Sequence, residues 1–589
     1  MAFLVSPGVN TSEIDLTTSV PAVGTSTGAT VGLFRWGPAN TVVQVSSESD
    51  LVEKFSTPDS NTAGSFLSAA NFLSYGNDLR VVRAISSGFE TQSNNSTSNT
   101  SHDITIKNDD EYFNSYINGV EPTAGNTFVA FAARYPGKLG NSLKVSVCSS
   151  DNDFNSWPYA PFFDAAPNTS NYALARTGNN YIKDELHLVV VDALGEITGT
   201  ANTVLERWSN LSKAGDAKEN GESIFYRDYL YRNSRWIHAL GHPAANAAVA
   251  NGNTWGVTVA TANNRVGNTF FLPAFSTTTY TLVNGSDGII TQADMIQSID
   301  LYLNKEKEDI SLLFAGDCGL GGNAAMSSAT ISNRYLTVAD TRKDCVAFVS
   351  PAKANVVGNV ASVTAVTNFR NALTSTSYGV MDSGYKKQYD KYNDAYPWIP
   401  LNADIAGLCV RTDLQRDPWF SPAGLNRGQI RNITQLALNP TQSQRDALYK
   451  AGVNPVVSFP GEGTVLFGDK TLQGRPSAFD RINVRRLFIV LEKAISAAAR
   501  SSLFEFNDEF TRSQFVGLVE PFLRDVQGRR GIFDFRVVCD EPNNTPAVID
   551  RNEFVGDIYV KPARSVNFIQ LNFVAVRSGV AFDEIVGRF

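Results

Sequence analysis

The residues best suited to hold a ligand's phosphates lie in the sequence FAGDCGLGGNAA. An apolar segment ends there in Gly316, Gly319, Gly321 and Gly322 before a helix-like stretch, and such glycines can bring phosphate to a helix N-terminus. The spacing is not G-x-G-x-x-G, and no Lys-Ser/Thr pair follows as in a P-loop. Tight turns between a strand and a helix also use glycine for backbone reasons alone. The spacing therefore gives little support to the alternative that residues 310–350 form a nucleotide-binding enzyme.

A second candidate for chemistry is the pair His238 and His242, whose four-residue spacing would place two zinc ligands on one face of a helix. The segment HALGH lacks the glutamate of a zinc hydrolase, and Gly241 and Pro243 predict a helix end or a loop. With four histidines in the chain, Ser-His-Asp or Cys-His catalysis has few candidates, and none lies in a nucleophile motif. The sequence therefore predicts no enzyme, no metal site and no cofactor.

Five cysteines are scattered along the chain without a C-x-x-C spacing. They are Cys148, Cys318, Cys345, Cys409 and Cys539. An odd number at such spacings favours reduced, buried thiols over a disulfide framework or a zinc site. The first residues show no secretory signal, and no run of about 18 apolar residues could span a bilayer. We therefore expect assembly in a cytosol, with no membrane insertion.

Tyrosines and lysines alternate in one segment that could stack nucleic-acid bases. Its members are Tyr385, Tyr389, Tyr392, Tyr396 and Trp398, interleaved with Lys386, Lys387 and Lys391. Asp390 and Asp394 dilute the positive charge, and the whole chain has a net charge of −8 and a pI near 5.3. These features favour an aromatic packing segment at a domain or subunit surface, and no direct contact with nucleic acid.

The negative charge is unevenly distributed along the chain. From residue 478 onward basic and acidic residues are equal in number, so the deficit of eight lies in residues 1–477. The neutral part contains two arginine pairs, Arg485 with Arg486 and Arg529 with Arg530. Each pair is either solvated surface charge or part of a positive patch that faces an acidic partner.

The elements that must position these residues are grouped into several domains, because 589 residues exceed what one hydrophobic core usually supports. The apolar segment DISLLFAG, a helix-like stretch over 323–338 and the apolar segment DCVAFVSP have the spacing of a βαβ unit with a buried parallel sheet. Helical stretches are also expected at 363–373 and 429–449. We expect this part of the chain to return to a sheet begun by residues 29–84.

The predicted fold is α+β and α/β, with discontinuous, nested domains. The expected parts are an extended N-terminal arm, 1–28; a central α/β domain, 29–88 plus 284–476; a polar outer insertion, 89–126; an α+β outer domain, 127–283; and a C-terminal domain, 477–589. The insertion has polar, low-complexity sequence that predicts an exposed and poorly packed loop or hairpin. The arm has too little apolar sequence for a core of its own, so it needs a partner.

The C-terminal domain has the clearest periodicity. Apolar residues recur at helical spacing over about 482–503 and predict an amphipathic helix; they are Leu487, Val490, Leu491, Ala494 and Ala498. Two strands are predicted by alternation, with apolar faces formed by Phe533, Phe535, Val537 and Cys539 and by Ile569, Leu571, Phe573 and Ala575. Such a small α+β domain leaves sheet edges that can accept a strand from a neighbouring subunit.

Motifs spread over nearly the whole chain resemble one protein family. The most specific lies between Gly384 and Arg431, GYKKQYDKYNDAYPWIPLNADIAGLCVRTD followed by SPAGLNRGQIRNIT. Others are SPGV, FRWGPAN and NFLSYGNDLRVVRA near the start, and FDRINVRRLF and NNTPAVIDRNEFV near the end. Together they resemble the signature of tail sheath proteins from contractile-tailed bacteriophages.

The resemblance implies six-subunit rings stacked helically around an inner tail tube, with the C-terminal domain nearest the tube. It implies a metastable extended sheath that contracts after the baseplate is triggered and drives the tube through the host envelope. The implied partners are further copies of the chain, the tail tube protein, and the baseplate and tail terminator or neck proteins, in a virion tail assembled in the host cytoplasm. A sheath from a contractile injection machine that is not a virion is the alternative within this class.

The N-terminal arm and the C-terminal domain are expected to supply the contacts between subunits. Arms that add strands to a neighbour's sheet keep their main-chain hydrogen bonds while a linker absorbs rotation. The residues expected between subunits are Ser6, Val9, Glu13, Ile14 and Leu16 in the arm, and Ile569, Leu571 and Phe573 in the last strand. The candidates for a tube-facing patch are Arg485, Arg486, Arg529 and Arg530.

Overall fold

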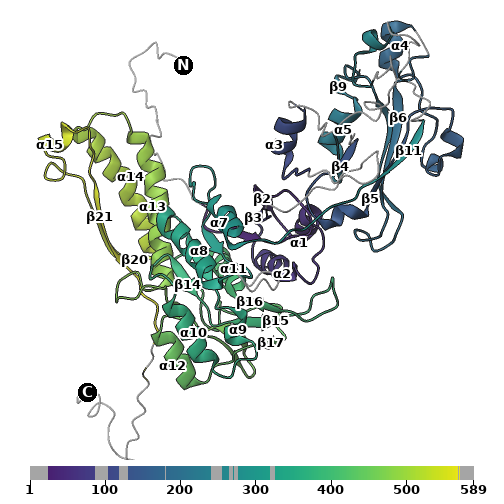
Figure 1. Cartoon of the computed structure of the whole chain (residues 1–589). Coiled ribbons are helices and arrows are strands. Elements are labelled where there is room, and N and C mark those ends of the chain that lie inside the picture. The colour runs from purple at the N-terminus through teal and green to yellow at the C-terminus, as the bar shows by residue number, and fades with distance from the viewer. Residues whose placement is uncertain are drawn as a thin grey trace, which may run out of the picture.

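The computed structural model describes residues 24–86, 104–117, 130–178, 181–240, 255–263, 270, 276–318, 326–567 and 570. These residues form a mixed α/β protein of several units (Figure 1). A body contains the central sheet and its helices, and the long C-terminal helices and strands lie along one side of it. A separate lobe, at the upper right of Figure 1, extends away from the body.

A six-stranded sheet forms the centre of the body. Its order is β14-β13-β12-β1-β3-β2, and all neighbours are parallel except β2, which is antiparallel to β3. The strands are β1 (Gly28–Gly32), β2 (Val42–Val45), β3 (Leu79–Arg83), β12 (Leu312–Phe314), β13 (Val346–Val349) and β14 (Gly379–Met381). Because β12 pairs with β1, the predicted return of the chain to its first sheet is confirmed.

Helices cover both faces of this sheet, which is why every residue of β1 is buried. One face packs against α2 (Ala63–Leu73) and α11 (Asn402–Gln415). The other packs against three helices, α7 (Gln292–Asp300), α8 (Ser328–Arg342) and α10 (Ser362–Asn371). Glycine in β1 allows the close approach of α2, since a Cβ at Gly28 would lie 2.3 Å from the ring of Phe72.

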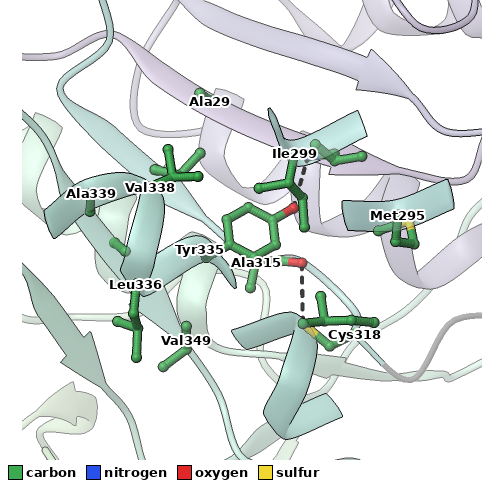
Figure 2. Close-up of a cluster of buried hydrophobic side chains, with 14 of the residues drawn as sticks. Ala29, Met295, Ile299, Ala315, Cys318, Tyr335, Leu336, Val338, Ala339 and Val349 are labelled. Carbon is green, nitrogen blue, oxygen red and sulfur yellow. Dashed lines mark hydrogen bonds between the residues drawn. The ribbon is translucent and has the colours of Figure 1, made fainter. Parts of the chain in front are cut away.

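Tyr335 of α8 lies at the centre of the second face, among side chains that include Ile299 and Leu336 (Figure 2). Its hydroxyl accepts a hydrogen bond from the backbone N–H of Val31 at 3.2 Å, which ties the helix to β1. The thiol of Cys318 donates to the carbonyl of Ala315 at 3.6 Å. The helix predicted over 323–338 is therefore present as α8, which begins later and is capped by Ser327.

The remaining helices and strands of the body are short. They are α1 (Glu48–Phe55), α9 (Lys353–Val356), β15 (Tyr385–Lys387), β16 (Trp398–Pro400), β17 (Gln435–Leu436), α12 (Gln442–Lys450), β18 (Val456–Phe459) and β19 (Gly463–Leu466). The helical stretch predicted over 429–449 is wrong in its first part, where β17 pairs with β15. Helix α12 begins only at Gln442, directly after the capping residue Thr441.

The lobe contains an antiparallel sheet of order β11-β5-β6-β7 and a pair of strands, β10 and β4. Its elements are β4 (Phe131–Ala133), β5 (Leu143–Cys148), α4 (Asn171–Thr177), β6 (Glu185–Asp192), β7 (Thr203–Ser212), β8 (Lys218–Glu219), β9 (Glu222–Ser223), α5 (Tyr226–Asn233), β10 (Ile237–Ala239), α6 (Val259–Asn263) and β11 (Thr277–Thr281).

Arg83 of β3 joins body and lobe. It is fully buried and donates to the carbonyls of Phe34, Gly37 and Pro136 at 2.9, 2.8 and 2.7 Å.

Residues 104–117 correct the prediction of a poorly packed insertion over 89–126. Ile104, Ile106 and Tyr112 are buried in one cluster with Ala132 and Leu240 of the lobe. Within this segment are α3 (Asp109–Tyr112) and a π-helical turn (Phe113–Ile117). Polar composition misled the prediction because the three apolar side chains that pack stand among polar ones. The rest of the insertion, 89–103 and 118–126, lies outside the described residues.

The C-terminal unit has its own hydrophobic cluster between two helices and a two-stranded sheet. Its elements are α13 (Ile482–Ala499), α14 (Glu509–Gly528), β20 (Ile532–Val538), α15 (Pro546–Ile549) and β21 (Asp557–Pro562). The amphipathic helix predicted over 482–503 is confirmed as α13, which ends in a 3-10 turn. Trp419, from the body, is buried in the same cluster and fastens the unit to the body.

Candidate assembly site

The sheet of the C-terminal unit is the first part of the site. β20 and β21 are antiparallel, from the pair Ile532 and Pro562 to the pair Val538 and Asp557. One face packs into the cluster below it through Phe535, Val537, Ile558 and Val560. Among the described residues this sheet has two strands only, so each strand presents one edge of backbone groups without a strand partner. A two-stranded ribbon is marginally stable by itself and can accept further strands.

A bulge at the start of β20 changes the predicted face of this strand. The pairing shifts between Ile532 and Asp534, so Phe533 is an extra residue on β20. Phe533 is 70% exposed, whereas alternation places it on the apolar face with Phe535. The prediction for Phe533 is therefore wrong, because strict alternation assumes an unbroken register. On the outer face, Lys561 forms an ion pair with Asp534 at 3.2 Å.

The residues predicted to contact neighbouring subunits belong to the N-terminal arm and to the predicted last strand; we call the segment after Asn567, which contains that strand, the C-terminal arm. Ser6, Val9, Glu13, Ile14 and Leu16 lie outside the described residues. Ile569, Leu571 and Phe573 also lie outside them. The segments that lead into both arms are described, however, and both are held by aspartates of the body.

The root of the N-terminal arm is held at Thr25. Its hydroxyl donates to Asp413 Oδ2 at 2.7 Å, and Arg486 of α13 donates to the same oxygen at 2.6 Å and to the Thr25 carbonyl at 3.4 Å. Ser311 donates to the carbonyl of Gly24 at 3.0 Å. Burial alone would lower the pKa of Arg486, but the neighbouring Asp413 outweighs it and raises that pKa. The arginine therefore stays charged and joins arm, body and C-terminal unit.

The same contacts remove Arg485 and Arg486 from the predicted tube-facing patch. Arg485 and Arg486 are each 4% exposed and so present almost no charge to a partner. Arg485 lies between the rings of Tyr378 and Phe479, 4.3 and 4.0 Å from their centroids. Burial lowers the pKa of Arg485. Helical periodicity could not reveal this, because the buried face of α13 is wide enough to include both arginines.

Arg529 and Arg530 lie at the turn between α14 and β20, and both are exposed. Arg529 forms ion pairs with Asp417 at 2.8 Å and with Asp525 at 3.1 Å, and its guanidinium lies 5.1 Å from the Trp419 ring. Arg530 has a left-handed backbone conformation, with φ of 67°. The structure thus separates the four arginines into two buried ones and two surface ones.

The root of the C-terminal arm is held at Ser565 and Asn567. The Ser565 hydroxyl donates to Asp469 Oδ2 at 2.6 Å, and Asn567 Nδ2 donates to the Tyr449 hydroxyl at 2.8 Å. Asp469 is 3% exposed and also forms an ion pair with Arg481 at 3.3 Å. The chain therefore leaves β21 and is fastened to the body before the predicted strand begins.

A cavity of about 620 Å³ lies between the body and the C-terminal unit, beside this second root. We call it the interdomain groove. Its walls come from the loop that begins at Trp419, from α12, from the turn before β20 and from the segment after β21. Arginine and aromatic side chains line it, together with Asp469 and Asn483.

The tyrosine and lysine segment packs inside the body. Lys386 Nζ contacts Asp404 Oδ1 at 2.9 Å, and both side chains are fully buried. The Tyr75 hydroxyl donates to the same oxygen at 3.2 Å. Burial raises the pKa of Asp404 and lowers that of Lys386, while their mutual attraction opposes both shifts. The segment therefore packs, as predicted, but it reaches the core of the body as well as a surface, where Tyr389 and Tyr396 are half exposed.

Gly316, the first glycine of the predicted turn, follows β12 where the strand order reverses between β1 and β12, the usual ligand position in doubly wound sheets. Gly316 has φ of 58° and exchanges two hydrogen bonds with the Asn402 amide, at 3.1 and 2.9 Å. Asp317 approaches the first turn of α2 so closely that a Cβ at Gly64 would lie 2.2 Å from its carboxylate. A carboxylate at this helix N-terminus repels phosphate. Gly319, Gly321 and Gly322 lie outside the described residues.

Of the residues weighed for metal and thiol chemistry, His238 and all five cysteines lie in the described part of the chain. His238 is buried in strand β10, with its ring stacked 3.8 Å from that of Tyr112, and burial lowers its pKa. His242 lies outside the described residues. All five cysteines are buried and free, as predicted. Over the described ranges, no group of His, Cys, Asp and Glu could hold a metal ion, and no helix is long and apolar enough to cross a membrane.

Three important residues were not found from the sequence. Asp413 and Asp469 each accept a hydrogen bond from the root of an arm, and Trp419 anchors the C-terminal unit. Their partners are far away in the chain, 388 residues in the case of Thr25 and Asp413. No local pattern marks such contacts, although the adjacent aromatic residues Trp419 and Phe420 in a loop are a weak signal for an anchor.

Three models of phage tail sheath domains match the chain. The model described as phage tail sheath protein central domain matches residues 288–472. The phage tail sheath C-terminal domain matches residues 475–575. The tail sheath protein Gp18 domain III N-terminal region matches residues 25–84. The first and third models include the strands that the central sheet brings together.

Curated relatives match the chain over almost its whole length. The tail sheath protein of Vibrio phage KVP40 is 34% identical, covering 99% of this chain and 100% of the relative. That of Enterobacteria phage T4 is 32% identical, covering 99% of both chains. That of Salmonella phage ViI is 33% identical, covering 99% of this chain and 98% of the relative.

Solved structures of sheath proteins are also similar. The helical sheath of the anti-feeding prophage in the contracted state has a TM-score of 0.48 at 12% identity, covering 97% of this chain and 99% of that one. The sheath tail protein from Listeria innocua has a TM-score of 0.49 at 11% identity, covering 92% and 96%.

Proposed function

The chain belongs to the tail sheath proteins of contractile-tailed bacteriophages, and we propose that its two arms join the subunits of one sheath by adding strands to the C-terminal sheet of neighbouring copies. As a sheath protein it is a structural subunit of the virion tail and serves genome ejection through the host envelope. Assembly takes place in the host cytoplasm. The nucleotide-binding alternative receives no support from these relatives.

One observation carries this proposal. Both arm roots are fastened to buried aspartates of the body, Asp413 and Asp469, while β20 and β21 present edges without a strand partner among the described residues. A fastened root transmits force from an arm to its own body, and a free edge receives the arm of another copy. The predicted strand residues Ile569, Leu571 and Phe573, and the arm residues from Ser6 to Leu16, are the segments that would add.

Contraction then requires links that survive large movements of rigid subunits. Main-chain hydrogen bonds between an arm and a neighbour's sheet persist while the residues between root and strand absorb the rotation. The partners in this proposal are further copies in stacked six-subunit rings, the tail tube protein, and the baseplate and tail terminator or neck proteins. Arg529 and Arg530 remain our candidates for contact with the tube, because they are the two exposed arginines of the four.

The proposed mechanism involves no catalysis. Energy stored in the extended lattice is released when subunits reach a lattice with better-matched contacts, and the baseplate supplies the kinetic trigger. The Asp317 carboxylate beside the first turn of α2 would repel phosphate at that helix N-terminus, which disfavours a nucleotide there.

The test is deletion of residues 1–20, which leaves Thr25 and its contacts in place. We expect a folded subunit with unchanged far-ultraviolet circular dichroism that forms no tubes in negative-stain electron microscopy. A matched control replaces residues 1–20 by a Gly-Ser segment of equal length, which restores the length but not the strand. Tubes of normal length from either variant would contradict the proposal.

A further inference from the structure

The interdomain groove carries positive charge that its own residues do not balance. Four arginines line it, Arg427, Arg445, Arg530 and Arg564, together with two aspartates, Asp446 and Asp469. Asp469 is already paired with Arg481 and bound by Ser565. The groove is therefore suited to an acidic occupant.

Aromatic rings of the groove lie beside two of its arginines. The guanidinium of Arg427 lies 5.6 Å from the Phe420 ring, and that of Arg445 lies 5.9 Å from the Phe467 ring. Stacking on a ring orients a guanidinium and leaves its edge available for a carboxylate. An occupant that combines carboxylates with apolar side chains would use both kinds of surface.

Asn483, at the start of α13, also lines the groove and lacks one hydrogen bond. Its side chain is 4% exposed, and its Oδ1 atom has no donor within the described residues. Its Nδ2 atom donates to the Ala563 carbonyl at 3.4 Å. A buried acceptor without a donor is unfavourable, so an occupant with N–H groups, such as a peptide, is favoured.

The interdomain groove lies at the end of the C-terminal sheet where β20 begins and β21 ends. Arg530 directly precedes the turn into β20, and Ala563 and Arg564 directly follow β21. A strand added to this sheet would thus lead its chain past one end of the groove. The residues of this chain that fit are Phe582, Asp583, Glu584, Ile585 and Val586, two adjacent carboxylates between apolar side chains.

We propose that the interdomain groove of each subunit binds residues 582–586 of a neighbouring copy, which rests on the proposed strand exchange. Six residues, 576–581, separate this segment from the predicted strand, and an extended chain of that length reaches about 20 Å. The carboxylates of Asp583 and Glu584 pair with the groove arginines, and the apolar neighbours contact Phe420 and Phe467. A backbone N–H of the segment serves Asn483.

Disulfide crosslinking in assembled tubes tests this binding. Gln442 lines the groove and is exposed, and the native cysteines are all buried. The full chain carrying Gln442→Cys and Phe582→Cys should give a ladder of covalent multimers after mild oxidation of its tubes, seen on a non-reducing gel. A control pairs Phe582→Cys with Arg524→Cys, on the exposed side of α14, and should give no ladder.

The outcomes separate the two proposals. Tubes that form without a ladder, or with a bond inside one chain only, would overturn the groove proposal and leave the strand exchange intact. Failure of the unmodified chain to form tubes would instead contradict the proposed function.

A peptide measurement decides the matter if the cysteine variants do not assemble. A fluorescent peptide of residues 578–589 is titrated with the full chain under conditions where it stays monomeric. One variant replaces both Arg445 and Arg564 by glutamine. It should bind the peptide about tenfold or more weakly than the unmodified chain, since each replacement removes a charge-assisted contact. Arg524→Gln is the matched control and should change nothing. Equal affinity for all three proteins, or no binding to any of them, would overturn the proposal. Arg530 is left unchanged so that its candidate tube contact stays separate.

Discussion

Arg486 and Asp413 are the side chains on which the root of the N-terminal arm depends. Removing one partner of a buried ion pair leaves an uncompensated charge, so Arg486→Ala should lower the free energy of unfolding by about 3 to 5 kcal/mol. The measurement is urea denaturation at neutral pH. The double variant Arg486→Met, Asp413→Leu leaves no unpaired charge and should regain most of the loss. Equal destabilisation by the single and double variants would contradict this role.

Asp382 gives the fold a dependence on pH. Burial raises its pKa to about 8, although hydrogen bonds from Ser350 and Gly384 favour the carboxylate. In the unfolded chain the pKa is about 4, so the folded state keeps the proton over a range where the unfolded state has lost it. The stability that this group contributes is therefore complete below pH about 4 and is lost as the pH rises to about 8.

The variant Asp382→Asn cannot ionise and keeps nearly the same shape. Its free energy of unfolding, relative to that of the unmodified chain, should therefore rise steadily between pH about 4 and about 8. Urea denaturation across this range measures the difference. Asp446→Asn, at an exposed position, is the control. A difference that does not change with pH would show that Asp382 titrates normally.

At the residue scale, burial was the property that the sequence predicted least well. Arg485 and Arg486 read as a surface pair because charged residues are rarely buried, yet long-range partners compensate both. The cysteines were predicted correctly because their chemistry alone favours buried thiols.

At the scale of elements, residues 104–117 are part of the lobe's core. Tyr112 is fully buried, its hydroxyl donates to the Ala239 carbonyl at 2.6 Å, and its ring stacks on His238. Tyr112→Ala should therefore destabilise the lobe by about 3 to 5 kcal/mol, which thermal unfolding measures. The matched variant Phe113→Ala removes a 42% exposed ring and should cost little. Equal losses of stability in the two variants would indicate instead that residues 104–117 form a poorly packed loop.

Strongly periodic elements were predicted best. The helix α13 and the strands β12 and β13 lie where apolar repetition indicates, because each buries a continuous face. Two features escaped prediction. The bulge at Phe533 depends on pairing with β21, and the loss of helix over 429–439 depends on pairing of β17 with β15. Neither partner is visible in a local window of sequence.

At the scale of the whole molecule, contraction should need no cofactor. Isolated tails exposed to mild denaturant in buffer with chelator and without ATP should contract fully, as seen by negative-stain microscopy. The reason is that the driving free energy is stored in subunit contacts when the extended sheath assembles. A control adds nucleotide and magnesium and should leave the contracted fraction unchanged. A requirement for either would reopen the nucleotide-binding alternative at the glycine-rich turn.

Subunits in our proposal are joined by strands exchanged onto the C-terminal sheet. Cryo-electron microscopy of tubes assembled from the full chain tests it most directly. We expect the sheet formed by β20 and β21 to gain strands whose density continues into the arm roots, Thr25 or Asn567, of other copies. A map in which this sheet keeps two strands, or in which the added strands belong to the same subunit, would contradict it.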